Sequence, residues 1–446
     1  MTAPPPRSLR VFLLGIYFVL VRPLLRLAAA FALAIGIAVL LCLLFAWRYR
    51  REALSVRFAG QSSLEGLAIA YERSEPNASA RRLEALAVRL GVRLAPSTAK
   101  GRPTPDAELA AREKALKEDL RTSLDGFVER ADGEPPRLTA GVREFLATHR
   151  ADLAAVQRHV LDEAIPLWEV RIDEVDAPLP NLLGFMTLVR LLCLQAVVDA
   201  EESCPADERL EAAWRLNGAL LKRPELISLL IYRANDSLLH RLVRTLPGTS
   251  PEWESRLASF DPVAAQVIAL RWEAPLLVRN LYKELMPAGG PIGAAVRGAA
   301  RPYLDMCGWE HALRMQALAK RHETLNYCAL TPESLEELWR PSTPRWNILS
   351  KIAWPELSSS TVRALRRRLD QELTGLVLLV RDGNLVSGEV PSRACPGNIW
   401  TVSARSDGTT IELARRVFDP VRKPLIQELS LRSVRKFVPA PGSTRR

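Results

Sequence analysis

The five histidines of the chain are the first residues to test for metal or acid–base chemistry. They are His149, His159, His240, His311 and His322. No two of them have the HxxxH or HExxH spacing that places a pair of zinc ligands on one helix face. We therefore expect no metal site and no cofactor. His322 lies beside Arg321 near the end of a predicted helix, which favours an interaction with the helix dipole over catalysis.

Two short loops are similar to known chemical motifs but lack the residues that the chemistry needs. Residues 289–293 (GGPIG) precede a helical pattern, yet they lack the Gly-Lys-Ser/Thr ending of a phosphate-binding loop and follow no predicted strand. Residues 60–64 (GQSSL) lack the GxSxG frame of an esterase nucleophile elbow. The first loop fits a hinge, and Ser62 fits a helix N-cap.

The acidic side chains do not form an evident acid–base pair. The paired carboxylates are Glu201 with Glu202, Glu336 with Glu337, and Asp173 with Glu174. Neighbouring residues on a helix or strand point apart, so such pairs do not converge on one substrate. The sequence therefore names no catalytic, cofactor-binding or metal-binding residue, and a site formed by distant segments is left open.

The positive charge lies at the two ends of the chain. The net charge is +11, but residues 1–51 contain seven arginines and no acid, and residues 431–446 contain five basic residues and no acid. Residues 52–430 are consequently almost neutral, which argues against a nucleic-acid-binding surface. The densest basic run of the body, residues 363–368 (RALRRR), is followed by Asp370 and Glu372. It predicts a salt-bridged helix face rather than an anion site.

The six cysteines form no recognisable disulfide or zinc pattern. They are Cys42, Cys193, Cys204, Cys307, Cys328 and Cys395. Cys42 lies in an apolar segment, and the other five are scattered without a CxxC pair, as expected of small buried hydrophobic residues. One bridge, for example Cys193–Cys204, stays possible if the body of the protein faces an oxidising compartment.

The clearest element is an apolar segment at residues 27–47 (LAAAFALAIGIAVLLCLLFAW). Its 21 uncharged residues would span about 31 Å as a helix, close to the hydrocarbon thickness of a bilayer. Arginines flank both ends, and Trp47 and Tyr49 stand where an interfacial aromatic belt is expected. The segment predicts a transmembrane helix that contacts the lipid bilayer.

The surrounding residues bear on the kind of anchor and on its orientation. Charged residues follow the span, so no signal cleavage site is evident and an uncleaved anchor is expected. The run Val11–Val21 is too short to cross a bilayer by itself; an interfacial helix, an extension of the main helix and half of a hairpin are its alternatives. The arginines nearly tie under the positive-inside rule. Because a short N-terminal tail commonly stays cytoplasmic, we expect an inner-membrane protein with a periplasmic body.

The residues from 52 to 330 predict successive helices. Periodic apolar stripes predict helices at 63–74, 77–91 with Asn77 as N-cap, 106–130 and 139–163. Alternation at Trp168, Val170 and Ile172 indicates a short strand. Three helices then follow with short connections, at 181–200, 207–222 and 224–246, and short connections make helices antiparallel neighbours. Helices at 262–284 and 294–325 complete this part, the first kinked or split at Pro275 and the second interrupted near Pro302.

Residues 182–198 (LLGFMTLVRLLCLQAVV) are apolar enough to require a test as a second span. Arg190 lies at the middle of the segment, where insertion into a bilayer would cost about 2.5–3.5 kcal/mol. A helix at the centre of the folded core is the better interpretation.

The C-terminal part has a mixed pattern. Residues 340–360 contain three prolines and two tryptophans and predict an irregular segment, and residues 361–373 predict a helix. Residues 375–380 (GLVLLV) predict a strand. Alternation at Trp400 and Val402 and again at residues 411–413, on either side of the turn at 406–408, predicts a β-hairpin.

The expected fold is therefore mainly α: a transmembrane helix, a helical hairpin array and a small C-terminal α+β unit. The predicted segments are a membrane anchor at 1–51, a helical segment at 52–165, a central helical array at 166–330, the α+β unit at 331–430 and a basic tail at 431–446.

Two stretches carry a resemblance. LLGFMTLVRLL from Leu182 and RPELISLLI from Arg223 resemble membrane-anchored helical proteins of high-GC bacteria for which no activity is assigned. The segment PESLEEL from Pro332, with the later Cys395-Pro396, Trp400 and Asp407-Gly408-Thr409, is similar to their C-terminal part. The resemblance covers about a third of the chain and implies a membrane-anchored helical protein without implying an activity.

These observations favour a single-pass, membrane-anchored helical protein that acts as a scaffold or binding module at a bacterial cell envelope, with a protein partner that the sequence does not identify. One alternative is an envelope hydrolase whose site is assembled from distant segments. Another is a component of a secretion or pilus-like apparatus, because an apolar N-terminal helix with a later hairpin is similar to pseudopilins by fold analogy.

Overall fold

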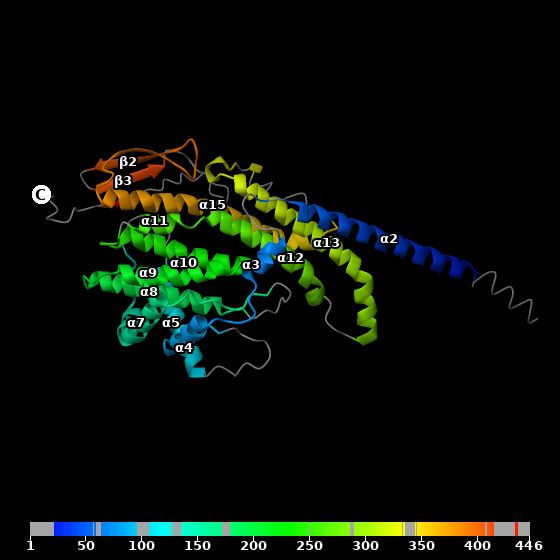
Figure 1. Ribbon diagram of the computed structural model, residues 1–446, viewed down its shortest axis with the longest axis horizontal. Helices are drawn as coiled ribbons and strands as arrows, with labels where there is room; N and C mark the ends of the chain where they lie inside the picture. The colour runs from blue at the N-terminus through cyan, green and yellow to red at the C-terminus, as the bar shows by residue number, and fades with distance from the viewer. Residues whose placement is uncertain are drawn as a thin grey trace, which may run out of the picture.

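The structure of the protein is a computed structural model. It describes residues 22–56, 58, 64–95, 107–125, 127, 135–171, 179–250, 252–285, 290–331, 333–334, 344, 346–405, 408–413 and 433–435. These residues form a mainly helical body from which one long N-terminal helix projects, with a small sheet on the opposite edge (Figure 1). The run Val11–Val21 and Ser62 lie outside the described residues.

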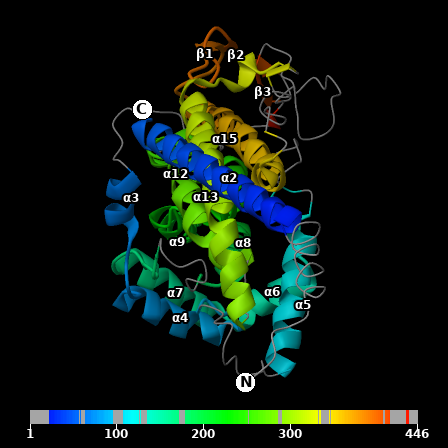
Figure 2. The ribbon, with the colours of Figure 1, turned by 90° about the vertical axis from the view of Figure 1, so that its right-hand side faces the viewer.

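The projecting element is helix α2, Arg22–Ser55, which contains the whole predicted span. It is one uninterrupted helix of 34 residues, so about 51 Å long at 1.5 Å per residue. It crosses α13 (Gly290–Thr324), and both helices run toward the body from their N-terminal ends, as the order of the colours along each helix shows (Figures 1 and 2). The apolar sequence is thus long enough to cross a membrane and also reaches into the body.

The first helices of the body form one side of the helical layer. They are α3 (Leu64–Tyr71), α4 (Ala78–Arg89), α5 (Ala107–Leu124), α6 (Ala140–Thr148) and α7 (Arg150–Asp162). The Asn77 side chain accepts a hydrogen bond from the Ala80 N–H, which confirms the predicted N-cap. The single helix predicted at 139–163 is two helices, because the chain turns at His149. Where a strand was expected near Trp168, Val170 makes only an isolated bridge with Arg73, and Ile172 lies outside the described residues.

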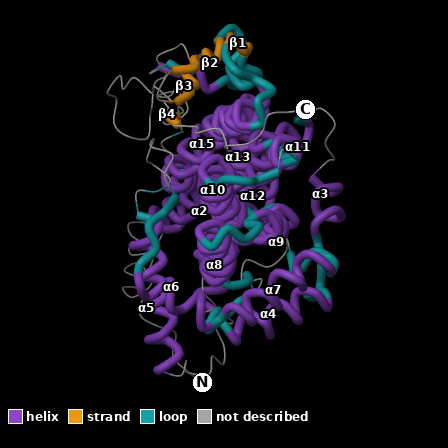
Figure 3. The backbone as a smooth tube through the Cα atoms, turned by 90° about the vertical axis from the view of Figure 1, so that its left-hand side faces the viewer, coloured by secondary structure: helices purple, strands orange, loops and turns teal. Residues whose placement is uncertain are grey.

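The centre of the body contains α8 (Leu182–Glu201), α9 (Asp207–Gly218) with the 3-10 turn η2 (Ala219–Lys222), and α10 (Leu226–Thr245). Seen from the end opposite α2, these helices pack side by side with α12 beyond them (Figure 3). Fully 78% of the apolar window of α8 is buried in the body, whereas none of the window of α2 is. The prediction that residues 182–198 form a core helix is therefore confirmed. Pro224 precedes α10 by two residues rather than starting it.

The remaining helices are α11 (Trp253–Ala258), α12 (Pro262–Leu285), α13, the 3-10 turn η3 (Tyr327–Ala329) and α15 (Ile348–Arg381). The interruption expected near Pro302 was wrong, and so was a split at Pro275, since α12 and α13 continue through both prolines; a kink at Pro275 stays a prediction. The irregular segment predicted at 340–360 was wrong from Ile348 onward, where α15 begins.

The strand predicted at 375–380 is also wrong, because these residues are the last turns of α15. Leu373, Leu376 and Val377 are buried at helical spacing in the second core. A continuous apolar run has no period of its own, so it does not distinguish a strand from a buried helix. These residues are helical because they continue the helix that begins at Ile348 and is already packed on the body.

The sheet contains four antiparallel strands in the order β1 (Gly388–Pro391), β2 (Ile399–Arg405), β3 (Gly408–Leu413) and β4 (Ser433–Arg435). β2 and β3 form the predicted hairpin, with Val402 opposite Ile411. β4 falls in the segment predicted as a basic tail. Trp400, Val402 and Ile411 are buried against the helical body, and the sheet lies along α15 (Figure 1).

Two main clusters of buried apolar side chains fill the body. The first joins α4–α11 through residues such as Leu83, Phe185 and Trp253. The second joins α12, α13, α15 and the sheet through residues such as Val267 and Trp400. The predicted boundaries at residues 165, 330 and 430 stay predictions.

One disulfide ties the second cluster together. Cys328 in η3 is bonded to Cys395 in the β1–β2 connection, with Cα atoms 5.5 Å apart. The suggested Cys193–Cys204 bridge was wrong: Cys193 is buried in α8, Cys204 is exposed, and both are free. Short sequence separation was a poor guide because packing on α15 brings together cysteines 67 residues apart.

Candidate functional site: an apolar helix and a buried polar cluster

The first half of α2 is exposed at every position from Arg22 to Ala38. Twelve large apolar side chains between Leu24 and Phe45 expose 41–68% of their surface. Burying the exposed part of each side chain in an apolar environment would be favourable by on the order of 1 kcal/mol, which gives about 10 kcal/mol for the whole set. That is comparable to the whole stability of a folded domain, so this surface fits an apolar environment and not water.

The second half of α2 is part of the body. Its less exposed residues follow a heptad-like stripe: Val39, Cys42, Ala46, Tyr49 and Ala53. Ala46 and Ala53 are buried, and α13 is the helix against which this half packs (Figure 2). Small side chains at these positions let the two helix backbones approach closely.

Aromatic and arginine side chains surround the point where α2 meets the body. We name Trp47, Tyr49, Arg50, Trp309 and Trp346 the interfacial collar. The Tyr49 ring stacks on Trp346 with centroids 6.4 Å apart, and the Arg50 guanidinium lies 5.5 Å from the Trp309 ring centroid. The collar thus joins residues of α2, of α13 and of the turn before α15.

The turn that carries Trp346 is fixed to α13. The Tyr303 hydroxyl donates to the Trp346 carbonyl at 2.5 Å, and the Asn347 amide donates to the Cys307 carbonyl at 3.0 Å. Trp346 is 36% exposed and Trp47 is 61% exposed. The collar is consequently held in place by the body while its tryptophans remain partly uncovered.

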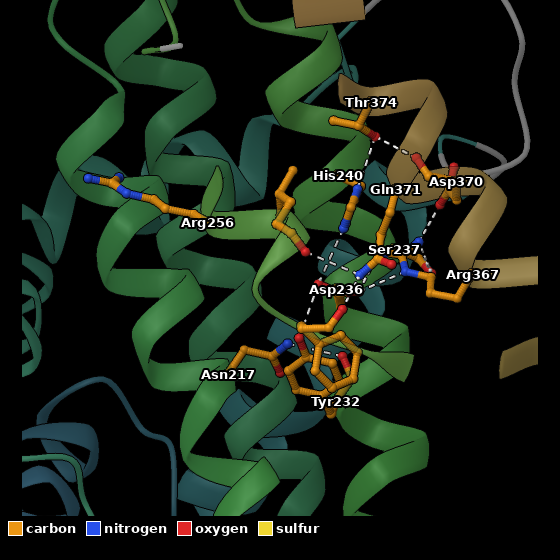
Figure 4. Close-up of polar contacts among 12 residues, drawn as sticks. Asn217, Tyr232, Asp236, Ser237, His240, Arg256, Arg367, Asp370, Gln371 and Thr374 are labelled. Carbon is orange, nitrogen blue, oxygen red and sulfur yellow. Dashed lines mark hydrogen bonds and ion pairs between the residues drawn. The ribbon is translucent and has the colours of Figure 1, made fainter. Parts of the chain in front are cut away.

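A second feature is a cluster of buried charges between α10 and α15 (Figure 4). Arg367 donates through Nε to Asp236 at 2.7 Å and through Nη1 to Ser237 and Asp370. Arg244 donates to Asp370 at 2.7 Å. Of the run at 363–368, Arg367 and Arg368 form ion pairs, but Arg367 is buried, and of the two predicted acidic partners Asp370 pairs with it whereas Glu372 binds the sheet. The partners Asp236 and Asp261 lie on other parts of the chain, the latter 2.9 Å from Arg368.

The charges of this cluster balance one another. Burial raises the pKa of Asp236, although the neighbouring Arg367 opposes the shift. Burial would also raise the pKa of Asp370, but Arg244 and Arg367 outweigh it and hold that pKa well below its usual range. Burial, reinforced by Arg367, lowers the pKa of His240 far below its usual value, so His240 is neutral at pH 7.

Thr374, His240 and Asp236 have the residue types of a nucleophile–base–acid triad. His240 Nδ1 lies 2.9 Å from Thr374 Oγ1, and His240 Nε2 lies 3.7 Å from Asp236. The Thr374 hydroxyl, however, donates to the Asp370 carbonyl one turn earlier and accepts from Arg244. All three triad-like side chains are buried. The Thr374 proton is held by the Asp370 carbonyl and is not directed at His240, and burial keeps a substrate away from the hydroxyl. The cluster therefore stabilises the contact between α10 and α15.

The remaining histidines do not gather. His149 lies 3.4 Å from Asp152, and His159 contacts Ser79. His322 is in the last turn of α13 but fully buried, and burial, with Arg233 next in effect, lowers its pKa to about 3. The expected dipole role was therefore wrong, because a neutral imidazole carries no charge to interact with the helix end.

The carboxylate pairs do not converge either. Glu201 pairs with Arg143 and Glu202 with Arg150, so these neighbours bind separate arginines on the surface. Asp173, Glu174, Glu336 and Glu337 lie outside the described residues. Among the residues that the structure describes, no group of three or more His, Cys, Asp or Glu side chains could hold a metal ion.

Sequence reasoning found α2 but missed the buried cluster, since its partners lie about 130 residues apart. The one signal was the four-residue spacing of Asp236 and His240 in α10, which places two polar groups on one helix face. No protein family, curated protein or solved structure matches this chain.

Proposed function

We propose that the protein is a single-pass, membrane-anchored helical scaffold or binding module of a cell envelope, with α2 as its anchor. The observation that carries the proposal is the exposed apolar surface of α2, continuous from Leu24 to Phe45. A surface of this size and length fits a bilayer, and arginines stand at both of its ends.

Several contacts favour a retained anchor over a removed signal sequence. Ala46 and Ala53 are buried against the body, and Tyr49 stacks on Trp346. Removal of α2 would uncover α13 and take Trp47, Tyr49 and Arg50 out of the collar. A signal sequence has no need of such contacts with the mature protein.

The disulfide supports a body on the oxidising side of the membrane. Disulfides persist in the periplasm and are rare in the cytosol. Cys328 and Cys395 lie at two positions of the body that packing alone already brings together. The disulfide therefore supports a periplasmic body.

A scaffold or binding role is favoured over hydrolysis because the Asp–His–Thr constellation of the described body is closed and ion-paired. C-terminal strands packed directly on the N-terminal helix would favour the alternative of a secretion or pilus-like apparatus component. In this fold the sheet lies on α15 and α2 packs on α13 (Figure 1). The protein partner of the module remains to be identified by capture from the membrane.

The test uses the full chain expressed in bacteria with an alkaline carbonate wash of the membranes. We expect the protein to stay in the membrane pellet at its full-length mass. The variant Leu33→Arg/Ile37→Arg places two charges in the exposed half of α2 and should move to the wash, whereas Arg121→Ala in α5 should not. Recovery of the unmodified chain in the wash, or of a product that starts beyond α2, would refute the anchor. A C-terminal periplasmic reporter tests the orientation in the same strains.

A further inference from the structure

The anchor and the body are joined without a linker. α2 remains a single helix from Arg22 to Ser55, and its second half packs on α13. The body therefore has a fixed height relative to the anchor. A flexible linker between anchor and body would instead allow a range of distances between the body and the membrane.

The depth of the body follows from the contacts along α2. If the hydrocarbon covers residues 27–47, then Phe45 lies in its last turn and Tyr49 just outside it. Phe45 and Tyr49 stack at 6.1 Å, and Tyr49 stacks on Trp346 at 6.4 Å. Trp346, a residue of the body, consequently lies at the height of the headgroup layer.

The chemistry of the collar matches that layer. Tryptophan and tyrosine combine an apolar ring with a polar edge and concentrate at membrane interfaces. Arg50 and Arg51 carry positive charge at the same height, with Arg51 5.7 Å from the Trp47 ring. Arginine beside such rings attracts the phosphates of anionic lipids.

We infer that the collar is a lipid-binding surface: Trp346, together with Trp47 and Arg50, lies in the headgroup layer, so the body contacts the membrane. This inference rests on the proposed anchor and adds a second contact, made by the body itself. The occupant is the phospholipid interface of the leaflet from which α2 emerges, because Trp346 stacks on Tyr49 and Tyr49 on Phe45, which ends the exposed apolar surface of α2.

The experiment places an environment-sensitive NBD fluorophore at single cysteines of the full chain in phosphatidylcholine–phosphatidylglycerol vesicles. The positions are Trp346→Cys in the collar, Leu44→Cys in the anchor as the control inside the bilayer, and the native Cys204, which is exposed in the connection between α8 and α9. The first two carry Cys204→Ser, and all carry Cys42→Ala. Lipids with a doxyl group near the headgroup or near the bilayer centre, and aqueous iodide, serve as quenchers.

We expect the label at 346 to be quenched several-fold more by headgroup-proximal doxyl lipid than by iodide. The label at 44 should respond to the central doxyl group and the label at 204 only to iodide. If 346 behaves like 204 while 44 is quenched by lipid, the collar does not bind lipid and the anchor still stands. If 44 is also quenched only by iodide, the anchor itself is refuted.

A label in place of Trp346 removes one ring of the collar, so a second position keeps that ring. Arg50→Cys in α2 is exposed and lies one residue from Tyr49. Its label should show the same preference for headgroup-proximal doxyl lipid. Iodide quenching at both 346 and 50 would overturn the inference even if one variant were locally disturbed.

Discussion

Asp236 of α10 and Arg367 of α15 form an ion pair of 2.7 Å between side chains that are only 2% and 5% exposed. Taking two charges out of water is costly, and their attraction offsets that cost only when the remaining polar atoms are also satisfied. Here Tyr232 and Ser237 contact the same pair from α10, and Asp370 adds a second acceptor from α15. The pair thus fixes how α10 and α15 face each other.

Removing one partner should be much worse than removing both. Asp236→Asn leaves Arg367 with less compensation in the interior and should lower the free energy of unfolding by about 3 kcal/mol. The double variant Asp236→Leu/Arg367→Met should recover most of that loss. Chemical unfolding in detergent micelles measures the stability of both variants. The control is Arg121→Ala, which removes the exposed ion pair between Arg121 and Glu118 and should change the stability little. Equal losses for the single and double variants would contradict the assigned role.

Stability should fall as the solution is acidified below about pH 6.5. Burial lowers the pKa of His311 to about 4 and that of His322 to about 3, and it lowers that of His240 as well. Below pH 6.5 the unfolded chain binds protons at these sites while the folded chain does not, so protons favour unfolding. Each histidine should contribute a loss of about 1.4 kcal/mol per pH unit until its folded-state pKa is reached.

Unfolding curves recorded from about pH 8 to about pH 5 test this dependence. His322→Gln should flatten the slope by about one third, because it removes one of the three histidines whose pKa is lowered by burial. A stability that rises on acidification would mean that the histidines are charged in the folded protein.

The disulfide should be present in cells and should stabilise the C-terminal part. It closes a loop of 67 residues, for which chain entropy gives about 4 kcal/mol. Alkylation with a maleimide polymer before and after reduction should add two reactive thiols on reduction. The exposed Cys204 is the internal control that reacts in both samples. Full reactivity of Cys328 and Cys395 without reductant would place the body in a reducing compartment.

Glu372 of α15 holds the sheet by three hydrogen bonds. Its carboxylate accepts from the Ser392 hydroxyl at 2.6 Å, from the Ala394 N–H at 2.5 Å and from the Trp400 indole at 3.0 Å. Glu372→Gln replaces one acceptor by a donor that faces these donors, which should cost about 1–3 kcal/mol. Faster amide exchange in residues 392–402 should report it. The exposed Glu389→Gln of β1 is the matched control, and an unchanged exchange rate in Glu372→Gln would show that the sheet is held by apolar packing alone.

The sequence was informative where one segment contained its own evidence. The apolar span, the core helix at 182–198, the Asn77 cap and the hairpin through Val402 and Ile411 could each be predicted from local pattern. Residues 375–380 could not, because an apolar run shows no period. The Cys328–Cys395 bond and the Asp236–Arg367 pair depend on partners 67 and 131 residues away, and no local pattern encodes such distances.

The contact between α2 and α13 gives the last prediction. Ala46 of α2 is buried in the stripe that faces α13, whereas Ala38, two turns earlier, is exposed. Ala46→Leu should overpack the interface and lower stability by about 1–3 kcal/mol, while Ala38→Leu adds apolar surface where lipid is expected and should be neutral or slightly favourable. Thermal unfolding of the full chain in vesicles, followed by protease sensitivity of the body, measures the difference. If α2 were removed during export, neither residue would be in the mature protein and both variants would unfold at the wild-type temperature. A destabilised Ala46→Leu beside an unaffected Ala38→Leu therefore requires a helix that is both retained and packed against the body over only its second half.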